Sequence, residues 1–356
     1  MNEKILKVGI SHGDINGIAY ELILKTFDDA RIFELCIPVV YGSSKALAYH
    51  RKYMNLPTVS FNMINSAKDA GTNRLNIVNC GNEEVTVEFG HSTSESEALA
   101  KEAFQRALSD LKSGFIDTLI IAPDNLDTTG ALSAYTASGQ NPLKILVYDS
   151  FRVALASDKI PLTEVASQLT VNSLTSQIKI LHSALLRDFM VTNPRIAVLS
   201  LNPGVGLKEK QFGKEESEVI IPSVKSAADE GIICFGPYSA DHFFGNNEYT
   251  RFDAVLAMYH DQGFIPFRSI AFEGGACYWA DLPFVATSSE KGVSYESAGK
   301  NESSEASFRN ALYAGIDIFN NRKLDAEIRK NPLKKQYFER GSDNEKLDLT
   351  KESNDE

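Results

Sequence analysis

Long apolar runs and closely spaced cysteines are what this sequence lacks. No run of about 18 apolar residues occurs in the chain, so we expect no membrane-spanning segment. The cysteines, Cys36, Cys80, Cys234 and Cys277, stand far apart without a Cys-x-x-Cys spacing, which is typical of reduced, structural cysteines. The N-terminal residues 1–10 are strand-like, and are too short and too charged for a signal peptide. These absences predict a cytoplasmic protein.

Positive charge is also scarce. The 356 residues include 36 basic and 47 acidic side chains, which give a net charge of −11. This balance argues against a broad surface for nucleic acid or for an anionic membrane, and leaves room only for a local basic pocket. The apolar content of 43% is that of an ordinary soluble protein. The length exceeds what one hydrophobic core usually holds, so we expect two lobes.

Short apolar strands alternate with amphipathic helices along the chain. The clearest helix, residues 92–112, carries one apolar stripe at helical spacing and ends at Ser113-Gly114. The alternation predicts an α/β protein with a mostly parallel sheet covered on both faces. We expect further helices at residues 20–27, 44–54, 162–169, 174–189, 215–230 and 304–321. We expect strands at residues 7–10, 38–42, 118–123, 144–148, 151–156, 195–201, 254–257, 270–278 and 284–288, and short strands within 58–90.

A conspicuous polar stretch follows the apolar run at residues 254–257. A strand there would place His260, Asp261 and Gln262 at the carboxyl edge of the sheet, where open α/β sheets bind ligands. An imidazole beside a carboxylate can ligate a metal or move a proton near neutral pH. A pair that only ties down a loop is the plainer alternative, and these residues alone favour it.

A glycine-containing turn follows the first strand. Gly13 and Gly17 would let the backbone approach a ligand closely, although a tight turn into the next helix explains them equally well. The turn lacks the Gly-x-Gly-x-x-Gly pattern of a dinucleotide site. Residues 124–140 are rich in small polar residues and predict a loop or a crossing between lobes.

Four stretches occur in the order and spacing of one known family. Residues 13–18 with Glu21 match an opening G-D-P-A-G-I-G-P-E, residues 152–156 and 201–203 match further segments, and residues 254–263 read A-V-L-A-M-Y-H-D-Q-G. On these motifs the chain resembles the 4-hydroxythreonine-4-phosphate dehydrogenase family of pyridoxal phosphate biosynthesis (PdxA), over about residues 5–325. The match around His260 is highly specific, and the others support it.

The resemblance implies a fold similar to isocitrate and isopropylmalate dehydrogenases, and a homodimer with a cleft between two lobes near the interface. We expect the first lobe to hold residues 1–126 and 300–330, the second 127–299, and residues 331–356 to form a charged, poorly ordered tail. Family members oxidise the hydroxyl of a phosphorylated hydroxy amino acid with NAD, and the oxo product loses carbon dioxide. A divalent metal (zinc, magnesium or cobalt) held by three histidines polarises the hydroxyl.

The chain departs from the family at the metal. His260 matches one of the three ligands, whereas Lys159 and Gly204 stand at the other two positions. Three protein ligands are the usual catalytic set, so we expect no tightly bound metal. A protonated Lys159 would repel a cation, but it can occupy the cation's place and pair with Asp241 or Asp261. We therefore take Lys159, Asp241 and Asp261 as the candidate catalytic residues.

The substrate and nucleotide segments are altered as well. Arg268 keeps the charge of a family lysine that binds phosphate, and with Gly13 and Asp14 it forms the candidate substrate site. In the adenine loop we expect Gly292, Glu296 and Gly299 to contact the cofactor, without deciding between NAD and NADP. Other family positions are changed: Cys277 and Ala286 replace an Asn and an Arg, residues 137–141 replace T-G-H-T-E, and the turn at residues 123–126 has no clear equivalent of the family lysine.

The changed positions are concentrated at the site, whereas the motifs of the scaffold are kept. Two functions are compatible with this pattern. One is an NAD-dependent dehydrogenase of a small phosphorylated or carboxylated hydroxy acid. The other is a catalytically silent paralogue that binds a small anion or partners with an active subunit. Of the remaining histidines, we expect His12 to be a turn residue and His242 to serve the surface. We place three more on helix or loop surfaces: His50, His91 and His182.

Overall fold

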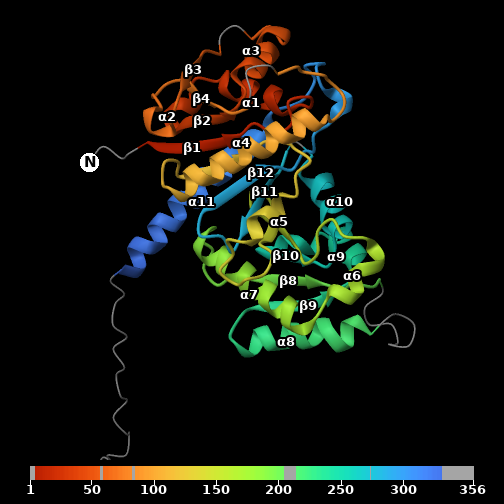
Figure 1. Cartoon of the computed structure of the whole chain (residues 1–356). Helices are drawn as coiled ribbons and strands as arrows, with labels where there is room; N and C mark the ends of the chain where they lie inside the picture. The colour runs from red at the N-terminus through yellow and green to blue at the C-terminus, as the bar shows by residue number, and fades with distance from the viewer. Residues whose placement is uncertain (1–4, 57–58, 82–84, 204–213, 273, 331–356) are drawn as a thin grey trace, which may run out of the picture.

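The computed structural model describes residues 5–56, 59–81, 85–203, 214–272 and 274–330 (Figure 1). Within them, twelve strands form one continuous sheet in the order β3-β4-β2-β1-β5-β12-β11-β6-β7-β10-β8-β9. Most neighbouring strands run parallel and helices lie on both sides of the sheet, so the predicted α/β class is confirmed. The expected tail and Gly204 lie outside the described residues.

One half of the sheet consists of parallel strands. Its members are β1 (Leu6–Ser11), β2 (Cys36–Gly42), β3 (Phe61–Ile64), β4 (Leu75–Asn79) and β5 (Thr118–Ile121). Both faces of β5 are buried, because Ile120 packs in one hydrophobic cluster while Leu119 and Ile121 pack in another. Burial on both faces explains why this strand is an uninterrupted apolar run in the sequence.

The other half contains strands of both directions. Its members are β6 (Leu143–Tyr148), β7 (Phe151–Leu155), β8 (Ile196–Leu199), β9 (Cys234–Tyr238) and β10 (Ala254–Ala257). Two strands join the halves: β12 (Val285–Ser289) runs parallel to β5, and β11 (Ala276–Ala280) runs antiparallel to both β12 and β6. The predicted lobe boundaries stay a prediction; β12, assigned to the second lobe, is hydrogen-bonded to β5 of the first.

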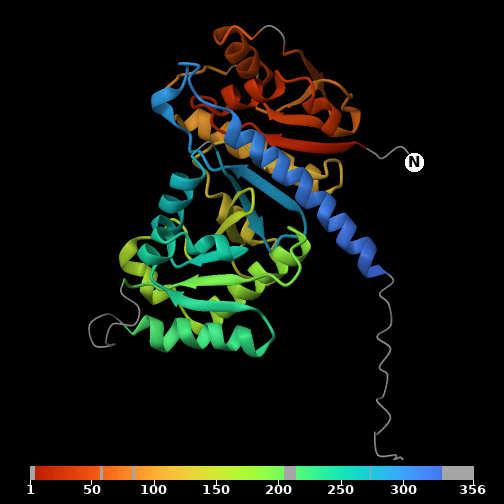
Figure 2. The same cartoon turned by 180° about the vertical axis from the view of Figure 1, so that it is seen from behind.

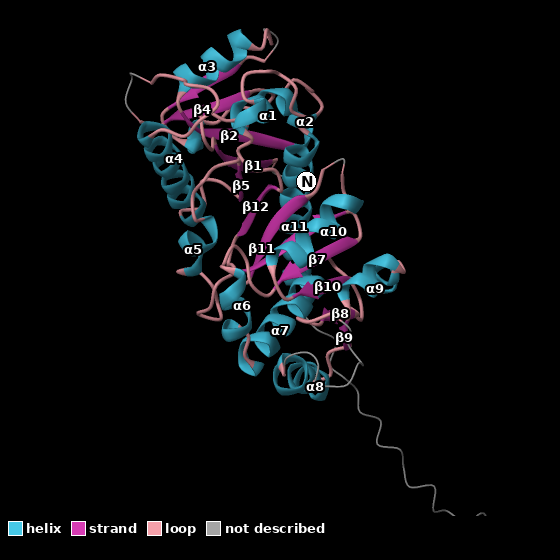
Figure 3. Ribbon diagram, turned by 90° about the vertical axis from the view of Figure 1, so that its right-hand side faces the viewer, coloured by secondary structure: helices cyan, strands magenta, loops and turns pink. Residues whose placement is uncertain are grey.

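Helices cover both faces of the sheet (Figure 3). On one face, α4 (Ser94–Lys112) contacts β1, β2 and β5; on the other, α11 (Ala306–Lys330) contacts β5, β11 and β12 and packs against α1 (Ala19–Phe27). Because α11 also reaches α7 (Val171–Arg187), it bridges the two halves, as the long blue helix in Figures 1 and 2 shows. The molecule is therefore held together by a shared sheet and a shared helix.

The clearest helix of the sequence, α4, forms for the reasons the pattern suggested. The Thr93 hydroxyl accepts a hydrogen bond from the Ser96 backbone N–H, and the Ser96 hydroxyl accepts one from the Thr93 N–H, which forms a capping box. The predicted apolar stripe is buried: Ala100, Ala103, Phe104, Ala107, Leu108 and Leu111.

Several shorter helices complete the fold. They are α2 (Ile32–Leu35), α3 (Ser44–Tyr53), α5 (Thr128–Ser133), α6 (Leu162–Gln168), α8 (Ile221–Asp229), α9 (Ala240–Gly245) and α10 (His260–Ile270). Single turns lie at Ala67–Asp69, Glu216–Ile220, Glu248–Arg251 and Tyr295–Ser297. Among the described residues, no helix is long and apolar enough to cross a membrane.

One predicted segment was wrong and another was incomplete. The strand expected at residues 270–278 begins only at Ala276, because Ile270 ends α10, whose Phe264 and Phe267 are buried against the sheet. Residues 124–140, expected to be a loop or a crossing between lobes, connect β5 of one half to β6 of the other, but they also contain α5, which begins where the Asp127 carboxylate accepts a hydrogen bond from the Gly130 N–H.

His50 was also placed wrongly, because it is buried. Its Nε2 lies 2.8 Å from the Ile15 carbonyl oxygen. His12 is buried too, directly after β1, with its ring stacked on Tyr20 at 5.3 Å between centroids. Burial lowers the pKa of each imidazole to about 4, so both are neutral at physiological pH.

Candidate functional site

A cavity of about 620 Å³ opens near the middle of the sheet. Because β11 and β6 alternate in direction, the carboxyl ends of β5 and β12 approach this cavity from one half, and those of β7 and β10 from the other. Side chains of β6 and β11, Lys144, Cys277 and Trp279, also line it. The ionisable side chains in its wall include Asp124, Lys144, Asp158, Lys159, His260, Arg268, Glu290 and Lys291.

His260 lies in the wall and is held by a chain of polar contacts. It is the first residue of α10, and its Nδ1 lies 2.6 Å from Asp158 Oδ1. The other oxygen of Asp158 accepts a hydrogen bond from the Lys144 ammonium group, which also lies 5.5 Å from the centre of the Trp279 ring. Phe264 stacks on the imidazole at 4.2 Å. These contacts fix the orientation of the imidazole.

The charge on Asp158 is stabilised by its two partners. Burial alone would raise the pKa of this carboxyl group, but the hydrogen bond from His260 and the charge of Lys144 outweigh it and lower the pKa to about 2. Asp158 therefore stays ionised, and it compensates Lys144 within the cavity wall.

Lys159 differs from the other cations of the cavity. Lys144 pairs with Asp158, and Arg268 pairs with Glu290 at 2.9 Å, whereas Lys159 has no hydrogen bond or ion pair within the described part of the chain. Its backbone φ of 51° lies in the left-handed region, which costs free energy for a residue with a Cβ. Strain of this kind often accompanies a functional position. The expected pairing with Asp241 or Asp261 is not formed.

Asp124 lines the same cavity as Lys159, in the turn after β5, and the two side chains interact electrostatically. Its Oδ1 accepts a hydrogen bond from the Leu126 N–H at 3.0 Å, while its Oδ2 is buried and has no hydrogen-bond partner among the described residues. Burial raises the pKa of this carboxyl group to about 7, although the charge of Lys159 opposes the rise. The group can therefore gain or lose a proton near neutral pH.

Gly13 and Asp14 lie behind the wall rather than in it. The left-handed φ of 71° at Gly13 lets the backbone pass the Pro123 carbonyl, which would lie 2.3 Å from a Cβ there. The Asp14 N–H donates to that carbonyl at 2.9 Å, and the Asp14 carboxylate accepts a 2.6 Å hydrogen bond from Tyr295. The two residues thus position the turn that carries Asp124, and the expected direct contact with substrate stays a prediction.

Asp241 and Asp261 are both exposed, and neither lines the cavity. Asp241 lies in α9 with 70% of its side chain exposed, accepts a hydrogen bond from Ser239, and lies 3.9 Å from His242. Asp261 lies in the first turn of α10 with His260. Their catalytic roles therefore stay predictions, since neither carboxylate lines the cavity.

A second cavity of about 620 Å³ adjoins the first. Both share Arg268, Glu290, Lys291 and Gly292. No heavy atom lies within 4 Å of where a Cβ of Gly292 would stand, so a ligand could approach the backbone there closely. Its wall also includes Ile18, Phe272, Ser294, Ser297 and Ser303. Four of the side chains in its wall are ionisable: Arg268, Glu290, Lys291 and Glu302.

The other expected cofactor residues lie beside this second cavity. Glu296 is exposed in the turn Tyr295–Ser297. Gly299 has a left-handed φ of 75° and packs so closely on Phe89 that a Cβ would lie 2.9 Å from the ring. Contact between these residues and a cofactor therefore stays a prediction.

The metal implied by the resemblance does not fit the residues present. His260 already uses Nδ1 for Asp158, Lys159 brings a positive charge, and Gly204 has no side chain that could ligate. No group of three or more His, Cys, Asp or Glu side chains suited to a metal occurs within residues 5–330 where they are described. The donor set is short of the usual three ligands.

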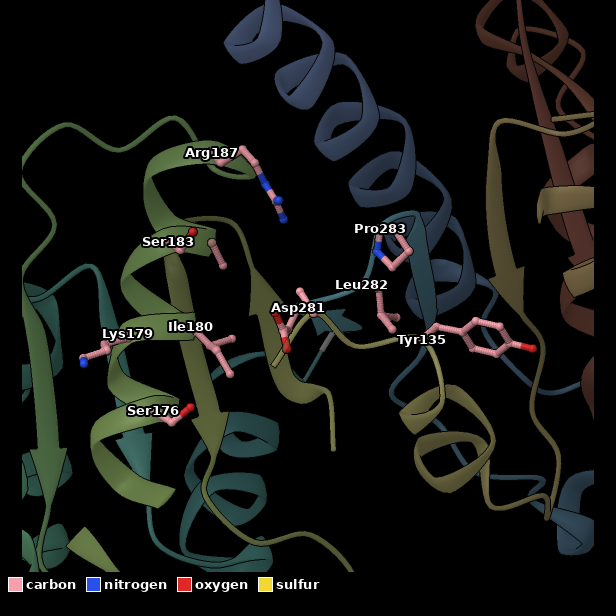
Figure 4. A pocket seen from close by; sticks show the side chains of 11 residues that line it. Tyr135, Ser176, Lys179, Ile180, Ser183, Arg187, Asp281, Leu282 and Pro283 are labelled. Atoms are coloured by element: carbon pink, nitrogen blue, oxygen red, sulfur yellow. The ribbon is translucent and has the colours of Figure 1, made fainter. Parts of the chain in front are cut away.

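A third cavity, of about 360 Å³, lies elsewhere, between α7 and the turn after β11 (Figure 4). Its cations are already neutralised, because Lys179 pairs with Glu230 and Arg187 pairs with Asp188. The Asp281 carboxylate is engaged by the Ser138 N–H. The charged side chains of this cavity are therefore less available to a ligand than Lys159 and Asp124 of the first.

Sequence reasoning missed Asp124, Lys144, Asp158 and Glu290. Two signals could have found some of them. Lys144 is a charged residue at the start of an otherwise apolar strand, and Asp158 directly precedes Lys159, two residues after the matched segment 152–156. Asp124 and Glu290 gave no such signal, because their importance comes from contacts across the sheet.

Comparisons with known proteins agree on one family. A family model described as "Pyridoxal phosphate biosynthetic protein PdxA" matches residues 34–315. A protein from Bacteroides thetaiotaomicron named 4-hydroxythreonine-4-phosphate dehydrogenase is 45% identical over 360 aligned positions, which cover 98% of each chain. A protein of the same name from Prosthecochloris aestuarii is 31% identical and covers 88% of this chain and 97% of the relative.

Solved structures give the same result. A 4-hydroxythreonine-4-phosphate dehydrogenase from Burkholderia phymatum superposes with a TM-score of 0.68 at 26% identity, over 89% of this chain and 99% of that one. The enzyme of that name from Klebsiella pneumoniae superposes with a TM-score of 0.73 at 23% identity, over 89% and 98% of the two chains, and supports the fold.

Proposed function

The chain belongs to the PdxA family, and from this premise we propose that it is an NAD-dependent dehydrogenase of a small phosphorylated hydroxy amino acid. The substrate of this class is 4-phosphohydroxythreonine, whose hydroxyl is oxidised and whose oxo product loses carbon dioxide. The silent-paralogue alternative is not favoured, because the relative of 45% identity spans nearly the whole chain.

The observation that carries this proposal is the pair of adjoining cavities. The first holds the unpaired Lys159 and the oriented His260, which suit an anionic, hydroxylated substrate. The second is open over the Gly292 backbone and suits the nucleotide. A substrate in the first cavity and a nicotinamide near the shared wall would be neighbours, as hydride transfer requires.

The residues have distinct tasks in this scheme. NAD, when bound, accepts the hydride. Arg268 holds the phosphate. To do so, its guanidinium group leaves its exposed contact with Glu290 and forms a charge-assisted pair with the ligand. His260 donates or accepts a hydrogen bond at the substrate through its free ring nitrogen, in the orientation that Asp158 sets.

We also propose that the protein acts in the cytoplasm as a homodimer, and its surface offers support for the second subunit near the cleft. Ile265 and Phe272 on and after α10 are 64% and 80% exposed, and Phe272 borders the second cavity. Exposed apolar side chains of this size commonly mark protein contacts. We assign this surface to the second subunit.

The test is the formation of NADH by the purified protein with 4-phosphohydroxythreonine, compared with the same amino acid without its phosphate. We expect turnover of the phosphorylated compound and little of the other. Arg268→Met should raise KM for the phosphorylated substrate at least tenfold, whereas Arg268→Lys should retain part of the affinity. A wild-type protein that forms no NADH from this substrate would contradict the proposed function.

A further inference from the structure

The family's metal ligands are not all kept in this sequence, since Lys159 and Gly204 replace two of the three histidines, so the oxidation proposed above needs another source of its chemistry. A divalent ion would stabilise the negative charge that develops on the substrate hydroxyl as its proton leaves. Two groups in the first cavity can divide this task between them. One is Lys159, a cation with no salt bridge in the described part of the chain, and the other is a proton acceptor, Asp124.

Lys159 is available for this role because the remaining positive charges of the cavity are engaged. Lys144 is held by Asp158, Arg268 is assigned above to the substrate phosphate in exchange for Glu290, and Lys291 donates to the Ser304 carbonyl oxygen at 3.0 Å. The left-handed backbone of Lys159, at φ 51°, is a strained position, and strain of this kind clusters at functional sites. An uncommitted ammonium group at a ligand cavity attracts a developing oxyanion.

Asp124 is available because one carboxylate oxygen has no partner. The Leu126 N–H fixes Oδ1, and Gly13 and Asp14 brace the Pro123 backbone just before it. Oδ2 remains buried without a donor among the described residues, which is unfavourable for a carboxylate until a ligand hydroxyl supplies one.

We propose that Lys159 and Asp124 together replace the family's metal ion in the oxidation step. The substrate O–H bond breaks and its proton moves to Asp124 Oδ2, while the Lys159 ammonium stabilises the oxygen. The electrons of the O–H bond form the C=O bond, and the C–H bond electrons leave with the hydrogen as hydride to the nicotinamide of NAD. This assignment rests on the proposed function and adds the groups that perform it.

The protonation behaviour of Asp124 supports this assignment. The charged and titratable groups that act on it are Lys159, from the turn after β7, and Asp14, from the loop after β1. Burial raises its pKa to about 7, Lys159 opposes the rise, and Asp14 adds to it. A base with a pKa close to the working pH is the most effective one for removing a hydroxyl proton.

Kinetics of three site variants and two surface controls test the proposal. Asp124→Asn should lower kcat by roughly 10²–10⁴-fold with little change in KM, and should remove the ionisation near pH 7 from the kcat/KM profile. Lys159→Met should lower kcat by about 10²-fold or more, and Lys159→Arg should restore part of it. The surface variants Lys101→Met and Asp229→Asn, on α4 and α8, are matched charge controls that should keep wild-type rates.

A titration separates an electrostatic pair from a merely structural one. The pKa of Asp124, followed by carbon NMR of labelled aspartate, should rise in Lys159→Met, because the ammonium that opposes the rise is gone. An unchanged pKa would overturn the pairing. Wild-type protein that makes no NADH would contradict the proposed function itself, whereas NADH formation that survives unaltered in Asp124→Asn and Lys159→Met would overturn only the present inference.

Discussion

At the scale of single residues, the site depends on charges that burial would otherwise disfavour. Asp158, Lys144 and His260 satisfy one another across three different elements, and Asp124 keeps an unpartnered oxygen. The sequence predicted His260 as a site residue, since its motif is specific, but not its partners. Partners that are distant along the chain become neighbours only when β6, β7 and β10 pair in the sheet.

Removing the Asp158 charge should destabilise the fold in a pH-dependent way. Asp158→Asn leaves the Lys144 ammonium without its counter-charge, so we expect a loss of about 3 kcal/mol in the free energy of unfolding at pH 7. The wild-type pKa is lowered to about 2, so the stabilisation is present above the unfolded value near 4 and is lost as pH falls toward 2. Urea unfolding between pH 3 and 7, with Lys144→Met/Asp158→Asn as control, measures it.

Asp124 should show the opposite dependence, because its pKa is raised to about 7. The folded state then binds a proton more tightly than the unfolded state, so its contribution to stability falls as pH rises from about 4 to about 7. Asp124→Asn removes this loss, and we expect the variant to be about 1–3 kcal/mol more stable than wild type at pH 8 and nearly equal at pH 4. Equal stabilities at pH 8 would show that the carboxyl group is not desolvated.

At the scale of elements, hydrophobic periodicity predicted the helices and strands that form because one or both faces are buried. It missed the elements whose formation depends on contacts with other segments. α4 and β5 follow directly from their apolar spacing. The error at residues 270–278 arose because an apolar run fits the end of α10 as well as a strand, and only the pairing of β11 with β6 and β12 separates them. α5 has few apolar residues and depends on its Asp127 cap, so hydrophobic spacing could not reveal it.

The loop between β1 and α1 offers a matched pair of glycine substitutions. Gly13 and Gly114 have left-handed φ angles of 71° and 70°, but only Gly13 lies against another segment, because a Cβ at Gly13 would stand 2.3 Å from the Pro123 carbonyl oxygen. Gly114→Ala should cost about 1 kcal/mol from the backbone conformation alone, and Gly13→Ala about 2–4 kcal/mol, with a loss of activity as Asp124 moves. Thermal unfolding compares the two; equal costs would contradict the bracing role of Gly13.

At the scale of the whole molecule, one sheet and α11 unite two halves whose carboxyl ends meet at a cavity. The fold class was predictable from the alternation of strands and helices, and the family from its motifs. The single continuous sheet could not be predicted, because the order of the strands depends on pairing between segments that are distant in the sequence. From the sequence, the cavity could be located only through its motif residues. The antiparallel pairing of β11 with β12 and with β6, which brings the two sets of carboxyl ends together, has no recognisable sequence pattern.

The proposed dimer is testable at its exposed apolar surface. Phe272→Asp places a charge where we assign the second subunit, so sedimentation analysis should show a shift from dimer to monomer. Met63→Asp, at a side chain 68% exposed on the edge strand β3, is the control that should leave the dimer intact. A wild-type monomer, or a Phe272→Asp dimer of unchanged stability, would contradict the assignment.

The central claim is that this family member oxidises its substrate without the family's metal, and one measurement tests it directly. The rate of NADH formation from 4-phosphohydroxythreonine is compared before and after exhaustive treatment with a chelator, with the metal content of the same sample determined by elemental analysis. If Lys159 and Asp124 replace the metal, we expect an unchanged rate in protein that contains no stoichiometric zinc, magnesium or cobalt. A rate that disappears on chelation and returns with one equivalent of a divalent ion would contradict it.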